Sequence, residues 1–302
     1  MTAPISTQGD REKQSAALSS LIAAVGLTTF KAVVGLATGS LGILAEAAHS
    51  ALDLMAAGMT YLAVRVSARP PDRTHLYGHG KFENLSAMAE TLLLLVTCAW
   101  VAWEACRRLI EGRTEVEVNA WSFAVMLTSI VVDVSRSRVL ARAAKKYNSQ
   151  ALEADALHFQ TDIWSSSVVI FGLIAVKVAE WRPQAALLRY GDAVAALGVS
   201  ALVVWVSLQL GRRTVDALMD HAPLGMEEEI AATVAAVPGV LNCHNLRIRY
   251  SGARLFIDLH ILVDGEQSLT LAHRLTETVE DAIRAIVPGA DVTVHPEPYE
   301  HS

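Results

Sequence analysis

The chain has 302 residues, of which 52% are hydrophobic and only 19% charged, and its formal net charge is −6. This balance is too apolar for an ordinary soluble domain and favours a protein that spans a bilayer. The negative charge and the scattered basic residues argue against binding to nucleic acid, and the three widely separated cysteines against a disulfide framework or a thiolate metal site.

Apolar stretches long enough to cross a bilayer recur six times after a polar segment at 1–14. A spanning helix needs about 20 mostly apolar residues. The predicted spans cover residues 15–37, 41–66, 83–110, 119–140, 151–180 and 190–212. Several spans carry charged residues, which we interpret as polar partners inside a helical bundle or near its rim: Lys31, Glu46, Glu90 and Asp133.

Basic residues predict the orientation of this domain, residues 15–213. Lys and Arg are concentrated at 65–81, at 136–146 and just after the last span. The opposite connections hold fewer, among them Arg113, Arg182 and Arg189. Because basic loops tend to stay in the cytoplasm, both termini are predicted to be cytoplasmic.

The chain changes character at residue 214. An amphipathic helix begins at GMEEEIAATV, and two alternating stretches, LNCHNLRIRY and ARLFIDLHIL, predict paired strands. A second helix, SLTLAHRLTETVEDAIRAIV, and a short strand, ADVTVHPEP, follow. The order αββαβ predicts a cytoplasmic α+β domain at 214–302 that resembles the ferredoxin-like metallochaperone fold.

Two pairs of ionisable residues lie inside the apolar spans, which is the most informative feature of the sequence. His49 and Asp53 are four residues apart in the second span, as are His158 and Asp162 in the fifth. Residues at this spacing share one helix face, so two such helices offer two nitrogen and two oxygen ligands, a set that suits Zn²⁺. The alternative for each pair is a helix-packing hydrogen bond. An acid in a bilayer is costly, and its repetition favours a cation site.

A second group of possible ligands lies in the loop after the second span. It consists of Asp72, His75 and His79. By chemistry alone, three solvated loop residues are the simpler explanation of this group.

A third group lies in the tail. His244 and His260 are on adjacent predicted strands, and His295 and Glu297 share one face of the last strand. His273 lies on the polar face of a helix, where a metal ligand and a solvated side chain are equally reasonable interpretations.

Together these features resemble the cation diffusion facilitators, which are dimeric antiporters of divalent metals and protons. The likeness rests on the six spans, the two HxxxD motifs, the motif Gly78-His79-Gly80-Lys81 followed by Glu83, and the αββαβ tail. It extends from about residue 15 to 297 and is closest to the bacterial zinc and iron efflux branch. The resemblance implies a homodimer in a bacterial inner membrane, with Zn²⁺ as substrate and as a regulatory or structural ion, and no organic cofactor.

The resemblance also implies roles for individual residues. It assigns the two HxxxD pairs to transport, the loop group to a second metal site, and the tail group, His273 included, to a cytoplasmic site. Lys81 resembles a lysine that pairs across the dimer, with Asp220 as its expected partner. The chain departs from the pattern in two places: many bacterial members have Asp where this chain has His49, and the tail carboxylate is usually Asp rather than Glu297.

The expected function is proton-coupled export of Zn²⁺, or another divalent transition metal, by alternating access around the four-ligand site. Metal and protons compete for the same ligand atoms. One alternative is a membrane-anchored sensor that binds metal without transporting it, which leaves the acids inside two spans unexplained. The other is an intramembrane metalloenzyme, which is disfavoured because there is no HExxH motif and four ligands already fill the site.

Overall fold

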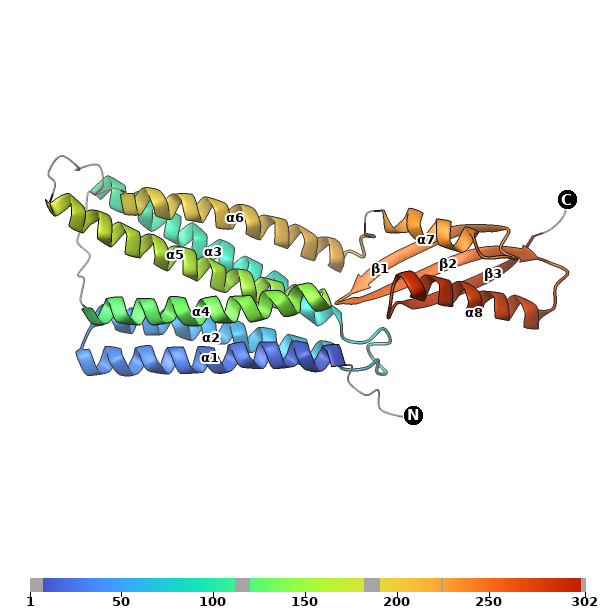
Figure 1. Cartoon of the computed structure of the whole chain (residues 1–302), viewed down its shortest axis with the longest axis horizontal. Helices are drawn as coiled ribbons and strands as arrows, with labels where there is room; N and C mark the ends of the chain where they lie inside the picture. Colours follow the sequence, from blue (N-terminus) through green and yellow to red (C-terminus); the bar gives the residue numbers. More distant parts are fainter. Residues whose placement is uncertain (1–7, 112–119, 182–190, 224, 300–302) are drawn as a thin grey trace. The chain divides into compact units, whose positions relative to one another are not determined.

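The computed structural model describes residues 8–111, 120–181, 191–223 and 225–299, which divide into two compact units that meet at residue 214 (Figure 1). The first unit is built from long helices. They are α1 (Gln8–Thr38), α2 (Leu41–Ser67), α3 (Lys81–Glu111), α4 (Ala120–Tyr147), α5 (Gln150–Trp181) and α6 (Gly191–Leu218), whose last turn enters the second unit. The six predicted spans are confirmed as helices, although residues 119 and 190, where two of them were expected to begin, lie outside the described residues.

Four of these helices pack around a shared interior. α1 contacts α2 and α4, α4 contacts α5, and α2 contacts α5; α3 lies against both α2 and α5. α1 and α2 approach closely because small residues line their interface. A Cβ atom added at Gly35 would lie 2.8 Å from Leu44 Cδ2. The turn between the two helices has Gly39 at φ 66° and Ser40 as the N-cap of α2, which gives a tight helical hairpin.

Polar and apolar side chains in this unit are arranged in the opposite way to those of a soluble protein. Large apolar side chains such as Leu36, Val96 and Trp103 are exposed, while Glu83 and Glu90 are fully buried. Hydropathy and length alone identify two spans among the described residues, α1 and the Lys81–Glu104 part of α3. In α4, the buried charged residues Asp133 and Arg136 lower the hydropathy of the helix.

The second unit is a small two-layer domain. It contains α7 (Met226–Ala235), β1 (Asn242–Ser251), β2 (Arg254–Asp264), α8 (Leu269–Ile286) and β3 (Asp291–Tyr299), in the predicted order αββαβ. The sheet order is β1-β2-β3, with β1 antiparallel and β3 parallel to the central β2. Alternate β2 residues, from Ile257 to Val263, pack with the helix residues Ile230 and Ile283 in the core. The other face of β2, which carries His260, is free of this core.

Candidate metal centres

The structure brings the two HxxxD pairs together between α2 and α5. Nε2 of His158 lies 3.1 Å from Asp53 Oδ1 and 3.7 Å from Asp162 Oδ2. Nε2 of His49 lies 3.8 Å from Asp53 Oδ1 and 3.9 Å from Asp162 Oδ1. One ligand atom from each of His49, Asp53 and Asp162 lies within 4.8 Å of the others. Each carboxylate therefore faces both imidazoles, as two opposed i, i+4 pairs require.

Exposure changes across this group of four residues. α2 and α5 run in opposite directions, so His49 and Asp162 lie on the side of the α1–α2 turn and Asp53 and His158 on the side where α1 begins (Figure 1). The side chain of His49 is 39% exposed and that of Asp162 20%, against 11% for Asp53 and 5% for His158. The group is therefore open on one side of the bundle and closed on the other.

Other charged residues in the spans have partners of their own. Lys31 Nζ lies 3.2 Å from Glu46 and 2.8 Å from Ser50 Oγ. Asp133 lies 3.4 Å from Arg136. The interpretation of Lys31, Glu46 and Asp133 as polar partners in the bundle agrees with these contacts.

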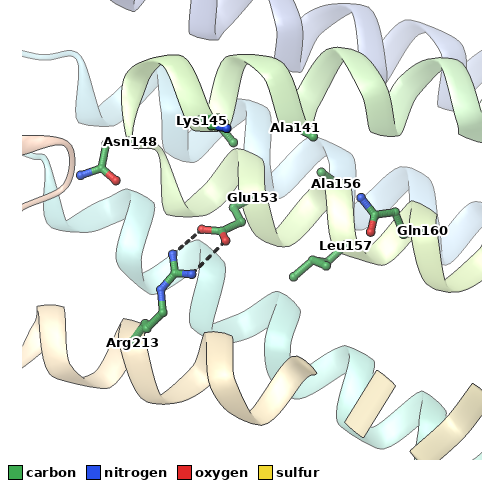
Figure 2. Close-up of a pocket in the computed structure, with 9 residues that line it drawn as sticks. Ala141, Lys145, Asn148, Glu153, Ala156, Leu157, Gln160 and Arg213 are labelled. Atoms are coloured by element: carbon green, nitrogen blue, oxygen red, sulfur yellow. Dashed lines mark hydrogen bonds and ion pairs between the residues drawn. The ribbon is translucent and has the colours of Figure 1, made fainter. Parts of the chain in front are cut away.

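A cavity of about 410 Å³ lies elsewhere, between α4, α5 and α6 (Figure 2). Arg213 crosses it with two bonds of 3.1 and 2.7 Å to Glu153, and Lys145 and Gln160 also line it. Its α5 residues occupy the face opposite that of His158 and Asp162, because Glu153, Leu157 and Gln160 recur at helical spacing. The histidine–aspartate group is therefore separate from this cavity.

The loop residues also lie together. Asp72 is 3.5 Å from His75 Nδ1 and 3.3 Å from His79 Nε2, and the two imidazole centroids are 4.5 Å apart. Backbone N–H groups of His75 and Thr74 and the Thr74 hydroxyl donate to Asp72 Oδ1, at 2.7 to 2.8 Å. These hydrogen bonds, that of His75 above all, hold the pKa of Asp72 well below its usual range. The carboxylate is thus fixed and charged, with its other oxygen directed at His79.

In the tail, sheet register aligns three histidines across the strands. His244 pairs with His260 and His260 with His295, with ring centroids 5.4 and 4.8 Å apart. Glu297 lies 2.8 Å from His260, 3.2 Å from His244 and 3.8 Å from His295. The hydrogen bond with His260, followed by the charges of the neighbouring imidazoles, lowers the pKa of Glu297. Glu297 is therefore the shared carboxylate of the row.

Three predicted residues lie outside these groups. His273 is exposed on α8 and lies 3.7 Å from Glu277, so this protomer does not bring it to the histidine row. Asp220, which has φ 59°, lies 3.6 Å from Arg249 of its own unit. The pairing of Lys81 with Asp220 across a dimer remains a prediction.

Two features were missed from the sequence. Asn245 Nδ2 lies 3.2 Å from His260 Nε2, at an irregularity in the pairing of β1 and β2 where Asn245 has φ 51°. Asn adopts this left-handed conformation more readily than most residues, so the Asn that follows His244 was an indication in the sequence that the strand is irregular here. Asp155 is buried in α5, three residues before His158, and received no assignment because it lies outside both HxxxD motifs.

Family models match nearly the whole chain. The model described as the cation efflux transmembrane domain matches residues 17–219, and that described as the cation efflux protein, cytoplasmic domain matches residues 223–299. The chain belongs to the cation efflux family. The resemblance to the cation diffusion facilitators is therefore confirmed, and the six helices form the transmembrane region of an integral membrane transporter rather than an enzyme.

Individual relatives of this cation efflux protein agree with the assignment. The cation-efflux pump FieF of Yersinia enterocolitica is 33% identical over 292 residues, which cover 94% of this chain and 92% of that protein. An uncharacterised transporter of Synechocystis is 31% identical, covering 87% and 83%. A solved structure of the transporter CzrB is 32% identical with a TM-score of 0.25, covering 26% of this chain and 99% of that chain.

Proposed function

We propose that this cation efflux protein exports Zn²⁺ from the cytoplasm in exchange for protons, and that His49, Asp53, His158 and Asp162 hold the transported ion. The observation that carries the proposal is the opposed arrangement of the two pairs, with all four imidazole-to-carboxylate distances between 3.1 and 3.9 Å. Two nitrogens and two oxygens fit a tetrahedral Zn²⁺.

Charge balance explains how such a site can exchange Zn²⁺ for protons. Two neutral imidazoles and two carboxylates around Zn²⁺ have no net charge, and neither have two protonated imidazoles and two carboxylates without the metal. The site can therefore change its exposure in either state without carrying net charge through the bilayer. Binding of protons and binding of metal exclude each other at the same atoms, which couples the two fluxes.

The gradient of exposure supports alternating access. With both termini in the cytoplasm, the exposed ligands His49 and Asp162 face outward and the buried ligands Asp53 and His158 face inward. This arrangement matches an outward-open state of a transporter in which helices rock around a fixed site. An inward-open state would reverse the gradient.

We propose a supporting role for the other two groups. The loop group binds a second metal ion, and the tail row of His244, His260, His295 and Glu297 binds metal when it is abundant and tightens a homodimer. His273, which lies apart from the row within one protomer, would join this site only in the dimer, and the Lys81–Asp220 pair links the site to the spans. Such coupling needs differential metal affinity between two states of the dimer.

Zinc uptake into proteoliposomes under an imposed pH gradient tests this function. Flux is expected in the intact protein and is expected to be lost in Asp53→Ala and Asp162→Ala. Glu46→Gln is the matched control, since Glu46 precedes His49 by three residues, is half exposed and pairs with Lys31. Zinc binding without flux in the intact protein would favour a sensor instead.

A further inference from the structure

Buried or half-buried polar residues recur at a spacing of seven on four helices of the bundle. Seven residues are about two helical turns, so they share one face and are about 10.5 Å apart along the axis. We call this set the polar column: Lys13 and Ser20 on α1, Asp53, Thr60 and Ser67 on α2, Glu83 and Glu90 on α3, and Asp155 and Asp162 on α5. The polar column begins where α1 begins and reaches the four-ligand site.

The first layer of the polar column is fully paired. Glu83 is 2.7 Å from Lys13 Nζ and 2.8 Å from Ser67 Oγ, and its second oxygen accepts from Ser149. These contacts join α1, α2, α3 and the start of α5. Both carboxylate oxygens of Glu83 are therefore paired, and the first layer closes that end of the bundle.

The middle layer is different, because two of its carboxylates are only half satisfied. Glu90 is fully buried; one oxygen accepts from the Thr60 hydroxyl, and Oε2 has no hydrogen-bond partner. Asp155 is 1% exposed; Oδ2 accepts from Ser20 at 3.4 Å, and Oδ1 has no partner. Ser20 in turn accepts from Arg136 at 3.2 Å. In each carboxylate, one oxygen therefore accepts a hydrogen bond and the other remains available to a cation.

These two carboxylates also interact with each other. Asp155 repels Glu90, while His158 of the four-ligand site attracts both acids. The buried Arg136 also attracts Asp155. Arg136 offsets part of the charge of Asp155, yet two neighbouring buried acids that each keep an unpaired oxygen are unfavourable unless a further cation or a proton joins them. The arrangement therefore has the chemistry of a cation site whose occupant is present only in part of a cycle.

We propose that Glu90 and Asp155, with the Thr60 hydroxyl, form an inner station that binds the transported divalent cation on its way from the cytoplasm to the four-ligand site. This inference rests on the proposed function. Two carboxylates neutralise a divalent cation, and an oxygen-only set binds a borderline metal such as Zn²⁺ less tightly than a set with two imidazoles. A weaker station before a tighter site lets the ion enter and move on.

Kinetics separate this station from the four-ligand site. In Glu90→Gln and Asp155→Asn, zinc flux at low cytoplasmic-side zinc is expected to fall about ten- to hundredfold, the range seen when a metal site loses a supporting partner. Equilibrium zinc affinity of the four-ligand site is expected to fall far less than the flux, because Glu90 and Asp155 act on His158 only through their charges. Glu90→Asp keeps the charge and is expected to restore part of the flux. Thr91→Val, at a buried neighbouring position on α3 outside the polar column, is the control and is expected to transport normally.

Three outcomes would overturn the station. Normal flux in both neutral variants would show that the acids are dispensable, and equal losses in Glu90→Gln and Glu90→Asp would show a packing role. Loss of zinc affinity at the four-ligand site would show that Glu90 acts on that site. By contrast, the absence of flux in the intact protein, or flux that survives Asp53→Ala, contradicts the proposed function.

Labelling tests the station without relying on zinc flux. Thr60→Cys, made with Cys98, Cys106 and Cys243 replaced by Ser, is treated with a membrane-impermeant cationic methanethiosulfonate from the cytoplasmic side. The station predicts that Cys at this buried position reacts and that Zn²⁺ slows the reaction. A thiol that never reacts, while one introduced at the exposed Leu76 does, would contradict an open path to the station.

Discussion

The transmembrane unit and the tail unit build the same ligand chemistry in opposite surroundings. In the bundle, His158 and Asp53 are buried, and further buried acids lie along the polar column. In the tail, His244 and His295 are exposed on the open face of a sheet, at the solvent-facing side of a complete core. The bundle group is open on one side only, so it passes an ion to the other side only when helices move, whereas the exposed row exchanges ions with solvent directly. The difference explains why one group suits transport and the other suits sensing.

Removal of a carboxylate from the bundle group is expected to have the largest effect. Asp162→Asn leaves two imidazoles with one carboxylate, so zinc transport should fall by more than the roughly 10- to 100-fold that loss of an outer-shell partner costs. Metal binding by the tail row should be unchanged. Flux in proteoliposomes and zinc binding to the tail unit, measured in the same variant, check both parts. Equal losses at both groups would mean that the two units are not independent in metal binding.

Replacement of an imidazole by a carboxylate in the bundle group is expected to change selectivity rather than abolish transport. His49→Asp makes the site harder and more negative, so the preference for Zn²⁺ over Cd²⁺ or Mn²⁺ should fall on the order of tenfold, or about 1.4 kcal/mol. Competition between metals for uptake measures this ratio. An unchanged ratio would show that His49, the most exposed of the four, does not contact the ion.

Loss of the tail row is expected to affect regulation only. The double variant His260→Ala and His295→Ala should keep the basal flux and lose an activation by zinc of about fivefold, the lower end of usual allosteric coupling. Flux as a function of cytoplasmic-side zinc measures the activation, and Glu277→Ala, which leaves the row intact, is the control. Activation that persists in the double variant would assign regulation to another region.

The smallest expected effect concerns acid stability of the tail unit. Because the folded state lowers the pKa of Glu297 from 4.5, the ionised carboxylate stabilises the fold above that value, and this contribution is lost as pH falls through the lowered pKa. Metal-free Glu297→Gln should therefore show a weaker decline in melting temperature between about pH 5 and pH 3, a window that contains the unshifted value and extends below it. A parallel decline in both proteins would contradict the interaction with His260.

Much of the molecule could be predicted from local patterns. Apolar stretches of spanning length, taken together with the charged residues inside several of them, predicted the six helices, and the i, i+4 rule placed His49 with Asp53 and His158 with Asp162 on shared faces. Alternation likewise placed His244 and His260 on adjacent strands, whereas their direct pairing follows an irregularity in the register between His244 and Arg247. Each of these features depends on spacing within one element or between neighbouring strands.

What could not be predicted depends on packing between helices that are distant in the sequence. The sequence interpretation treated Glu90 as an ordinary polar partner, and its hydrogen bond with Thr60 agrees with that. That Oε2 of Glu90 remains unpaired near Asp155 follows only from the packing of α3 against α2 and α5. The separation of His273 from the histidine row likewise depends on how α8 packs on the sheet.

X-ray absorption at the zinc edge would test most directly that the two HxxxD pairs hold the ion. The sample is the full-length protein with one bound Zn²⁺, in which the loop and tail groups have been disabled by His75→Ala, His79→Ala, His260→Ala and His295→Ala. The account predicts four nitrogen or oxygen ligands at about 2.0–2.1 Å with the scattering of two imidazole rings, one of which disappears in His158→Asn. A six-coordinate oxygen shell without imidazole, or a spectrum unchanged in His158→Asn, would contradict it.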